Sequence, residues 1–405
     1  MITEEEFAEK ARNFLAAHAR RKDEAGDDQE SLEADAVART KAFQRALFDA
    51  GLAGLTYPVE YGGQGLSRGY QEIYTREASQ FTLPTNAITI SHGMCLPILN
   101  DFGTPEHKAR HLRKIISAEE IWCQMFSEPG AGSDVASLQT RAELDGDEWV
   151  VNGQKVWTSG AQFCDYGLCL ARTSVDVPKH EGISMFIIDM RGAGVDIRPL
   201  RQITGDADFN EIFFTDVRIP KTWLVGELNR GWNVAVAMLM YERLALGAGG
   251  AGPMASRRFD RLVDVARSHS LTHDVTIRQA LADFYIRETI LRYVGLRMRD
   301  ALRAGRAPGP EGSIAKLASA QLAVLGASVA ARIAGPAAIA WTGNAPGGDQ
   351  IARGVLAAPA IGIAGGTNEV QRNIIGERVL GLPKEPSADK GVPFKDLLVG
   401  TQRRG

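Results

Sequence analysis

The stretch Phe-Ser-Glu-Pro-Gly-Ala-Gly-Ser-Asp, residues 126–134, has the composition of a loop that meets a ligand. Glycines at 130 and 132 allow the backbone to approach a bound group closely. The hydroxyls of Ser127 and Ser133 can donate or accept hydrogen bonds. Taken alone, the stretch is more typical of an ordinary turn, and the sequence around it changes that interpretation.

A second segment, NGQKVWTSGA at residues 152–161, complements the first. The indole of Trp157 can stack on a flat ring, and the hydroxyls of Thr158 and Ser159 can hydrogen-bond the edge of that ring. Two such loops in one β domain predict a slot for a planar heterocycle. The sequence has neither a G-x-x-x-x-G-K-S/T phosphate loop nor a strand–GxGxxG–helix unit, so a dinucleotide site would not be of the Rossmann kind.

Residues 121–226 are predicted to form the β domain that holds both loops. β-branched and aromatic residues occur there in short runs, such as Val150–Val151 and Ile212–Phe214. Asn152-Gly153 stands between DEWVV and QKVWT and predicts a hairpin turn, and RGAG at 191–194 predicts a second turn. Short strands with such turns favour a β-barrel or sandwich of about 100 residues.

The segments on either side are predicted to be helical, because apolar residues recur there at helical spacing. Thr104-Pro105 predicts a helix start, with Thr104 as the cap and Pro105 at the first helical position. The small-residue run GAGGAGP at 247–253 is predicted to separate two helices. The expected helical segments are 69–100, 106–118, 232–246, 255–268, 276–304, 313–334 and 367–380.

The order of helices, strands and helices predicts an α+β multidomain protein. We expect an N-terminal helical domain over residues 1–120 and a middle β-barrel or sandwich domain over 121–229. A C-terminal helical bundle is expected over 230–385, and residues 386–405 are expected to be a loosely held polar tail.

Composition excludes several classes of protein. The 405 residues include 46 Lys plus Arg and 49 Asp plus Glu, so the formal charge of −3 argues against a nucleic-acid binder with a broad basic surface. Four cysteines without a C-x-x-C pair are too few for a disulfide scaffold. We expect no membrane span, because no stretch approaches the ~18 apolar residues required. The acidic N-terminus lacks a signal-peptide pattern, so we expect a cytoplasmic protein.

Two histidine pairs have the i, i+4 spacing that can hold a metal on a helix: His107/His111 and His269/His273. The H-E-x-x-H arrangement requires a glutamate after the first histidine, and Lys108 and Ser270 stand there instead. We therefore expect surface histidines and no metal site.

Together, SEPGAGSD followed by NGQKVWTSGA identify a resemblance to the acyl-CoA dehydrogenase family of flavoproteins. The resemblance covers essentially the whole chain, from YPVEYGGQGLS at 57–67 to IAGGTNEVQRNIIGERVLG at 363–381. It implies an N-terminal helical domain, a middle β domain and a C-terminal four-helix bundle. It also implies FAD bound between the last two domains, an acyl-CoA substrate, an electron-transfer flavoprotein as partner, and a homodimer or homotetramer.

The resemblance also implies roles for individual residues. The strand before the Pro-Gly turn, with Gln124, Phe126 and Ser127, would contact the flavin. Ser133 would bond FAD or acyl-CoA. Trp157 would shield the flavin, Thr158 would bond the edge of its ring, and Ser159 would lie near flavin N5. From the C-terminal domain, Thr367 and Glu369 would contact FAD, and Arg267 matches an arginine that holds the FAD pyrophosphate of a neighbouring subunit. The family's Q-x-x-G-G-x-G stretch is represented here only by RIAGPAA at 332–338.

The catalytic base is the main departure from the common family pattern. The reaction removes a proton from the carbon α to a thioester, which requires a carboxylate base, and donors such as backbone N–H groups at the thioester oxygen. Many members place a glutamate where this chain has Gly365, beside Gly366. A minority, resembling isovaleryl- and long-chain-acyl-CoA dehydrogenases, carry the base on an earlier helix. That helix is AMLMYERLALG at 237–247, where Glu242 matches the base and Arg243 the arginine that follows it.

Two other functions stay open from the sequence. A flavin-dependent monooxygenase on the same fold would also lack the late glutamate, and it would need a different oxidant and a second reductant. A weakly catalytic subunit of a hetero-oligomer would bind FAD poorly alone. The glycine at 365, with Gly247, Gly249 and Gly250 after Glu242, suggests room for a branched or bulky acyl chain.

Overall fold

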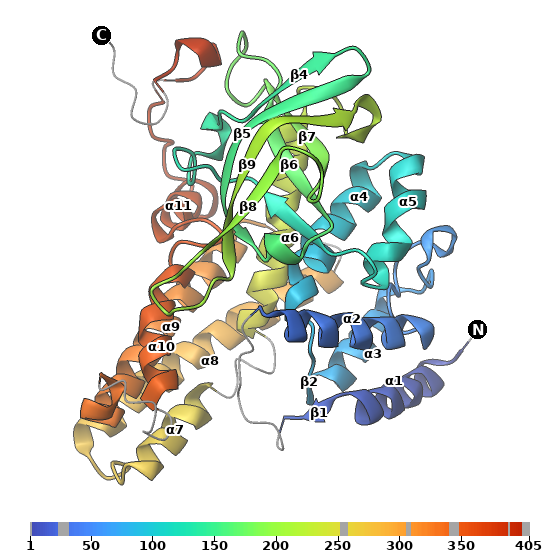
Figure 1. The fold of residues 1–405 in the computed structure, drawn as a ribbon. Coiled ribbons are helices and arrows are strands. Elements are labelled where there is room, and N and C mark those ends of the chain that lie inside the picture. Colours follow the sequence, from blue (N-terminus) through green and yellow to red (C-terminus); the bar gives the residue numbers. More distant parts are fainter. Residues whose placement is uncertain are drawn as a thin grey trace. The chain divides into compact units, whose positions relative to one another are not determined.

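The chain folds into two compact units in a computed structural model that describes residues 2–22, 32–251, 258–304, 309–339, 348–387 and 389–398. Unit 1 comprises Met1–Gln202, Asp206–Tyr241 and Ser387–Gly405. Unit 2 comprises Ile203–Gly205 and Glu242–Pro386. Figure 1 shows the helices and strands of both units along the chain.

Unit 1 begins with helices that bury one apolar face each. They are α1 (Glu4–His18), α2 (Ala34–Asp49), α3 (Arg68–Ala78), α4 (Leu96–Phe102) and α5 (Pro105–Ile116). The predicted start of α5 is confirmed, because the Thr104 hydroxyl accepts from His107 N and His107 Nδ1 accepts from Thr104 N. The single helix expected over 69–100 is interrupted after Ala78 by strand β2 (Phe81–Thr82), which pairs with β1 (Arg20–Arg21). Pro84 lacks the N–H that a continuing helix needs.

The other part of unit 1 is a sheet of eight strands within the described residues. The strands are β3 (Trp122–Met125), β4 (Arg141–Asp145), β5 (Glu148–Ser159), β6 (Tyr166–Arg172), β7 (Ile183–Asp189), β8 (Val195–Leu200), β9 (Phe209–Pro220) and β10 (Leu224–Val225). Their order is β10-β7-β6-β4-β5-β9-β8, and β3 runs parallel to β6. Along β6, Leu168 and Leu170 pack in the core shared with the helices, while Cys169 and Ala171 pack in a second core. This alternation places β6 between two apolar layers.

The hairpin predicted at Asn152-Gly153 is wrong. β5 runs through both residues, and the β4–β5 turn lies instead at Gly146-Asp147, where Gly146 has φ +64°. Asn152 bonds the Asp216 backbone and side chain on β9, and a Cβ on Gly153 would lie 2.5 Å from the Thr140 hydroxyl oxygen. The glycine is therefore needed for close approach to Thr140 and for an irregular register, and not for a turn. The turn predicted at 191–194 separates β7 from β8 as expected.

The tail expected to be loosely held is instead packed over residues 389–398, which belong to unit 1. Phe394 is buried, its N–H donates to the Val177 carbonyl at 2.9 Å, and its ring covers the Arg172 guanidinium. The sequence did not indicate this packing because one aromatic residue in a polar stretch gives no periodic pattern. Residues 399–405 lie outside the described part of the chain.

Unit 2 contains the C-terminal helices. They are the later part of α6 (Gly231–Ala251), α7 (Arg258–Ser268), α8 (Val275–Arg303), α9 (Gly312–Ala334), α10 (Gly348–Ile361) and α11 (Asn368–Ile374). Helices α7, α8 and α10 pack against α9. The expected fold class is confirmed, with two differences. α6 continues through Gly247 to Ala251, and α10 was not predicted from its glycine- and alanine-rich sequence, which includes Pro359 inside the helix.

One helical stretch among the described residues, Gly312–Ala338, is long and apolar enough to cross a membrane by length and composition alone. Its mean hydropathy reaches 1.5, so the expectation that no stretch approaches the apolar length of a span is wrong. In unit 2 this stretch contains α9, the helix against which α7, α8, α10 and α11 pack. Only 22% of its most apolar window is buried within the described residues, and a single helix of this kind is weak evidence for a span.

Candidate active site

The two motifs of the β domain lie side by side in unit 1. The N–H of Val156 donates to the carbonyl of Ser127 at 2.9 Å, which joins residues 126–134 to the end of β5. Gln124 lies on β3 opposite Leu168 of β6, Phe126 is buried, and Ser127 is half-buried. The structure therefore brings together three of the residues predicted to contact a flavin with the segment that contains Trp157, Thr158 and Ser159.

A buried ion pair that the sequence did not indicate connects the same two motifs. Lys155 is fully buried, and its Nζ lies 2.8 Å from Glu128 Oε1 and 3.1 Å from the Phe126 carbonyl. Glu128 also accepts from the backbone N–H groups of Gln139 and Thr140. Burial alone would raise the pKa of Glu128, but Lys155 and these donors hold it below its usual value. The sequence signal for this buried ion pair is a lysine at position 155, within a strand in which about half of the residues are apolar.

Trp157 adopts a backbone conformation that side chains rarely tolerate. Its φ is +62°, and the register between β5 and β9 shifts between Lys155 and Thr158. The indole is 61% exposed, and it meets the ring of Phe209 edge to face, with ring centroids 6.0 Å apart. Left-handed non-glycine residues concentrate at functional sites. The irregularity leaves a large flat ring uncovered at the end of β5.

Thr158 and Ser159 follow this irregularity. Thr158 is buried, yet its hydroxyl finds no hydrogen-bond partner among the described residues. Its carbonyl accepts from Asn210 Nδ2 at 3.1 Å, which fixes the strand end on β9. Ser159 is half-buried. An orphaned buried hydroxyl beside an exposed indole fits a site completed by a bound polar ring.

Ser133 stands on the outer part of the first loop. It is exposed, and a Cβ on neighbouring Gly132 would meet nothing within 4 Å among the described residues. The inner part of the loop is closed by two backbone hydrogen bonds between Glu128 and Ala131. Asp134, at the end of the loop, pairs with Lys179 at 2.8 Å. The glycine-rich tip is thus held at its two ends.

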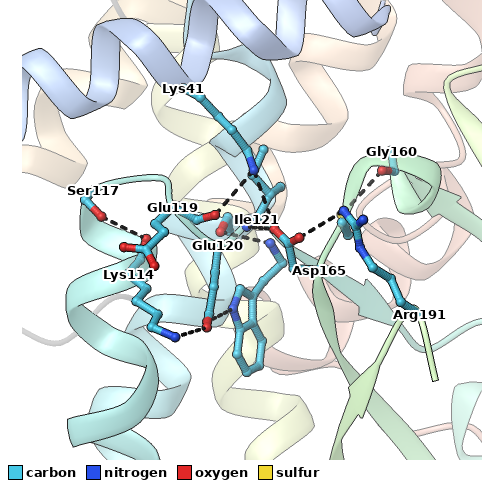
Figure 2. A network of polar contacts seen from close by, with 12 residues as sticks. Lys41, Lys114, Ser117, Glu119, Glu120, Ile121, Gly160, Asp165 and Arg191 are labelled. Atoms are coloured by element: carbon cyan, nitrogen blue, oxygen red, sulfur yellow. Dashed lines mark hydrogen bonds and ion pairs between the residues drawn. The ribbon is translucent and has the colours of Figure 1, made fainter.

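A polar network anchors the strands beneath the site to the N-terminal helices (Figure 2). Asp165, just before β6, accepts from Ile121 N at 3.0 Å and pairs with Lys41 of α2 and Arg191. Glu120, just before β3, pairs with Lys114 of α5. Asp165 and Glu120 thereby tie the starts of β6 and β3 to the helices.

Glu120 has two further partners at the same place. Its carboxylate contacts His111 Nδ1 at 2.8 Å and accepts from Trp122 Nε1 at 3.1 Å. Burial opposes ionisation of Glu120, but these donors and Lys114 hold its pKa below the usual value.

The second set of predicted residues lies in unit 2, at the turn before α11. Gly365 and Gly366 have φ of +67° and +88°, and the Thr367 hydroxyl caps α11 by accepting from Val370 N. Gln371 donates to the Gly365 carbonyl at 2.9 Å, and Lys316 of α9 donates to the Gly366 carbonyl at 2.5 Å. Glu369 is exposed and pairs with Arg372. The sequence did not single out Lys316 or Gln371 as the residues that hold this turn.

Glu242, the predicted base, is half-buried on α6. Burial lowers the pKa of Lys316, and the carboxylates of Glu369 and Glu242 oppose that shift. Glu242 therefore acts electrostatically on the ammonium that holds Gly366, and both lie in unit 2. The Arg243 side chain lies outside the described part of the structure. Arg267 on α7 is exposed and pairs with Asp264 of the same helix.

The histidine pairs do not face common ligand positions. His107 and His111 are buried, contrary to the expectation of surface residues, and each has its own partner: Thr222 O for His107 and Glu120 for His111. His269 and His273 are exposed. Among the described residues no group of three or more His, Cys, Asp or Glu is placed to hold a metal ion. All four cysteines are buried and unpaired.

Family models match almost the entire chain. The N-terminal domain of acyl-CoA dehydrogenases matches residues 2–119, the middle domain 123–217 and the C-terminal domain 229–380. The chain belongs to the acyl-CoA dehydrogenase family. It is an oxidoreductase, and because members of this family are flavoproteins, membership implies FAD. The sequence-based recognition of the family is confirmed.

Similar proteins include a curated relative and two solved structures. Acyl-CoA dehydrogenase IpdE1 of Mycobacterium tuberculosis is 38% identical over 87% of this chain and 90% of its own length. The Tcur3481-Tcur3483 steroid ACAD has a TM-score of 0.77 at 28% identity, covering 94% of this chain and 97% of that one. The ChsE4-ChsE5 complex from Mycobacterium tuberculosis has a TM-score of 0.75 at 30% identity, covering 95% and 99%.

Proposed function

We propose that this acyl-CoA dehydrogenase catalyses FAD-dependent α,β-dehydrogenation of an acyl-CoA thioester to the trans-2-enoyl-CoA, with electrons passing to an electron-transfer flavoprotein. The supporting observation is the junction of the two motifs, where the exposed Trp157 indole and the unpartnered Thr158 hydroxyl lie beside Ser127. A flat ring with polar edge atoms would satisfy both groups. The donor set therefore fits FAD.

FAD would supply the acceptor for the β-hydride. The residues of this chain would hold it: Trp157 against the ring face, Thr158 and Ser159 at the ring edge, and Gln124, Phe126 and Ser127 from the β3 side. In unit 2, Thr367 and Glu369 would contact FAD from the cap and the first turn of α11. Ser133 would contact FAD or acyl-CoA, and Arg267 would serve a neighbouring subunit.

Glu242 would accept the proton from the substrate carbon α to the thioester. Gly365 offers no side chain for that role, while Glu242 is a carboxylate that interacts with Lys316 beside Gly366. The N–H groups of Gly365 and Gly366 would face the developing negative charge on the thioester oxygen, a role that needs no side chain. Arg243, next on α6, would contribute positive charge to the substrate site.

We propose that the acyl group is bulky, with a polycyclic or branched carbon skeleton. The absence of a side chain at Gly365 removes a carboxylate from the place where many members have one, and a similar solved structure is described as a steroid ACAD. A straight acyl chain would require no extra space in the substrate site next to Glu242.

A second candidate is a subunit of a hetero-oligomeric acyl-CoA dehydrogenase. Two similar solved structures are each named for a pair of different chains: Tcur3481-Tcur3483 and ChsE4-ChsE5. In that case the chain purified alone would hold little flavin and would gain flavin and activity with its partner chain. A homodimer or homotetramer with stoichiometric flavin would favour the first proposal.

The test is anaerobic reduction of the flavin in the purified protein. A steroid-carboxyl-CoA, isovaleryl-CoA and hexanoyl-CoA should be compared, with flavin absorbance recorded by stopped flow and the enoyl-CoA product identified by mass spectrometry. We expect fastest bleaching with the polycyclic thioester and reoxidation by an electron-transfer flavoprotein. A colourless protein that ignores added FAD would contradict the first proposal. Substrate hydroxylation that needs a second reductant would indicate a monooxygenase instead.

A further inference from the structure

The C-terminal strap, residues 389–398, lies along the loop between β6 and β7. Phe394 N donates to the Val177 carbonyl at 2.9 Å and Lys395 N donates to the Val175 carbonyl at 3.0 Å. Pro393 and Pro178 form an isolated bridge between the two segments. The last described residues of the chain thus extend the backbone pairing of a loop that begins more than 200 residues earlier, in the same unit.

Arg172 connects this loop to the segment that follows the ligand loop. It is buried at the end of β6, and its guanidinium donates to the carbonyls of Ala136 at 2.6 Å, Leu138 at 3.2 Å and Lys179 at 2.6 Å. The ring of Phe394 lies over it, with Cζ 3.6 Å from the ring centroid. Burial lowers the pKa of Arg172 to about 10, below its usual range. The strap therefore covers a desolvated cation, which strengthens the cation–π contact.

Lys179 connects the strap directly to the ligand loop. Its Nζ lies 2.8 Å from Asp134 Oδ2 and 2.5 Å from Asp389 Oδ2, and its side chain is only 12% exposed. Asp134 is the last residue of SEPGAGSD, and it also accepts from the Ser137 hydroxyl at 2.5 Å. One ammonium is shared by a carboxylate of the ligand loop and a carboxylate of the strap.

We propose that Lys179 and the C-terminal strap are positioning elements that hold the loop 129–134 in its ligand-binding conformation. Gly130 and Gly132 give that loop high conformational freedom, and the space around Gly132 is open among the described residues. The first half of the loop is held by buried Ala131, which bonds Glu128, and by the Glu128–Lys155 pair, whereas the exposed residues Gly132 and Ser133 are followed by the Asp134–Lys179 pair. Without Asp389, Lys179 loses its partner on the strap, and without Phe394, Arg172, which donates to the Lys179 carbonyl, loses its cover.

The proposal rests on the proposed function for the identity of the ligand, but the loop itself can be observed without any ligand. The experiment uses the full-length protein stripped of flavin, as wild type and as Lys179→Met, Lys179→Arg, Asp389→Asn and Phe394→Ala variants. Lys395→Met is the matched control, because Lys395 lies on the strap and pairs with exposed Asp176, away from the ligand loop. Hydrogen exchange of peptides covering 129–138 is measured first, and FAD dissociation by fluorescence second.

We expect exchange over 129–138 to accelerate about tenfold or more in Lys179→Met and Asp389→Asn, which lose a charge-assisted hydrogen bond. Phe394→Ala loses the cation–π contact with Arg172, for which we expect an acceleration of about threefold or more. Lys179→Arg should restore slow exchange, and Lys395→Met should match wild type. FAD or acyl-CoA affinity should fall by a similar factor, while flavin reduction at saturating substrate stays within about twofold, because the reacting groups are unchanged.

Two outcomes would overturn the proposal. One is exchange over 129–138 at the wild-type rate in Asp389→Asn and Phe394→Ala. The other is acceleration spread equally over β5 and β9, which would indicate general loss of stability. If exchange responds as expected but none of the proteins binds FAD, the strap holds the loop and the proposed function is wrong.

Discussion

At the scale of single residues, Glu242 is the sharpest prediction. Glu242→Gln keeps the shape and hydrogen-bonding capacity of the side chain and removes its basicity. We expect the rate of anaerobic flavin reduction to fall on the order of 10²–10⁴-fold, the contribution of a positioned base. Flavin content should stay at the wild-type level. Stopped-flow absorbance with a good substrate measures the first quantity and the visible spectrum of the purified protein the second.

Two further variants make this test specific. Glu385→Gln, an exposed glutamate in the same unit, should reduce flavin at the wild-type rate. Adding Gly365→Glu to Glu242→Gln should restore little activity, because Gly365 has φ +67°, where an L side chain is strained by roughly 1–2 kcal/mol. Flavin reduction by Glu242→Gln at nearly the wild-type rate would place the base elsewhere.

A substitution at Thr158 should affect flavin binding and protein stability in different ways. Thr158→Val removes the buried hydroxyl that has no partner among the described residues. Without flavin, we expect the free energy of unfolding to stay constant or rise by about 1 kcal/mol, since an unsatisfied polar group is removed. With flavin, the FAD dissociation constant should rise about tenfold. Thermal unfolding of the flavin-free protein and FAD titration check the two. Equal FAD affinity in the variant would show that the hydroxyl faces no ligand.

At the scale of elements, the Lys155–Glu128 pair holds β5 to the first motif. Lys155→Met leaves the Glu128 carboxylate buried without its cation, so we expect the free energy of unfolding to fall by about 3–5 kcal/mol. Combining Lys155→Met with Glu128→Gln should recover part of that loss, because no buried charge is then left without its cation. The recovery should be incomplete, because Gln139 N and Thr140 N donate to different oxygens of Glu128 and an amide keeps only one of them. Urea unfolding followed by tryptophan fluorescence measures both. Additive losses in the double variant would argue against a coupled pair.

The first turn of α5 should make stability depend on pH. His107 accepts from Thr104 N through Nδ1, so its Nε2–H donates to the Thr222 carbonyl, and the ring must be neutral. Burial lowers the pKa of His107, with the hydrogen bond to Thr222 opposing the shift. The unfolded chain therefore binds a proton first as pH falls. Stability is present above about pH 6.5 and is lost progressively below it, until the folded protein protonates.

The variant His107→Gln isolates this effect. Glutamine at the third helical position keeps the capping bond to Thr104 N and does not titrate. We expect the wild-type melting temperature to fall more than that of His107→Gln between pH 7.5 and 5.5, measured by calorimetry. Parallel losses in the two proteins would assign the acid sensitivity to other groups.

Sequence patterns predicted helices and strands well where the apolar periodicity or the cap chemistry is local. They failed where a few tertiary contacts determine the local backbone structure. The start of α5 followed from Thr104 and Pro105 because cap chemistry is local. The hairpin at Asn152-Gly153 failed because Asp216 and Thr140, distant in sequence, occupy the space around those residues. At the site, the sequence motif NGQKVWTSGA indicated Trp157 and Thr158. Lys179, Lys316 and the strap were not predicted, because their roles depend on tertiary contacts between distant segments.

At the scale of the whole molecule, α8 carries an exposed apolar stripe. Ile286, Ile290 and Tyr293 follow one another at helical spacing and are each more than half exposed. Such a stripe is typical of a subunit interface. We expect Ile286→Glu with Ile290→Glu to convert an oligomer into monomers by light scattering at micromolar concentration, while Val275→Glu, elsewhere on α8, leaves the mass unchanged. A wild-type monomer with full activity would contradict the expected assembly.

The strap also sets an order of events during synthesis. Unit 1 is assembled from three stretches of chain, and the last of them follows every helix of unit 2. Domains generally fold in the order in which they leave the ribosome. Here the sheet can form early, but Asp389 and Phe394 reach Lys179 and Arg172 only after every helix of unit 2 has been synthesised. Anchoring of the ligand loop therefore comes after synthesis of unit 2, and a chain that stops before residue 389 would carry a complete sheet and an unfinished site.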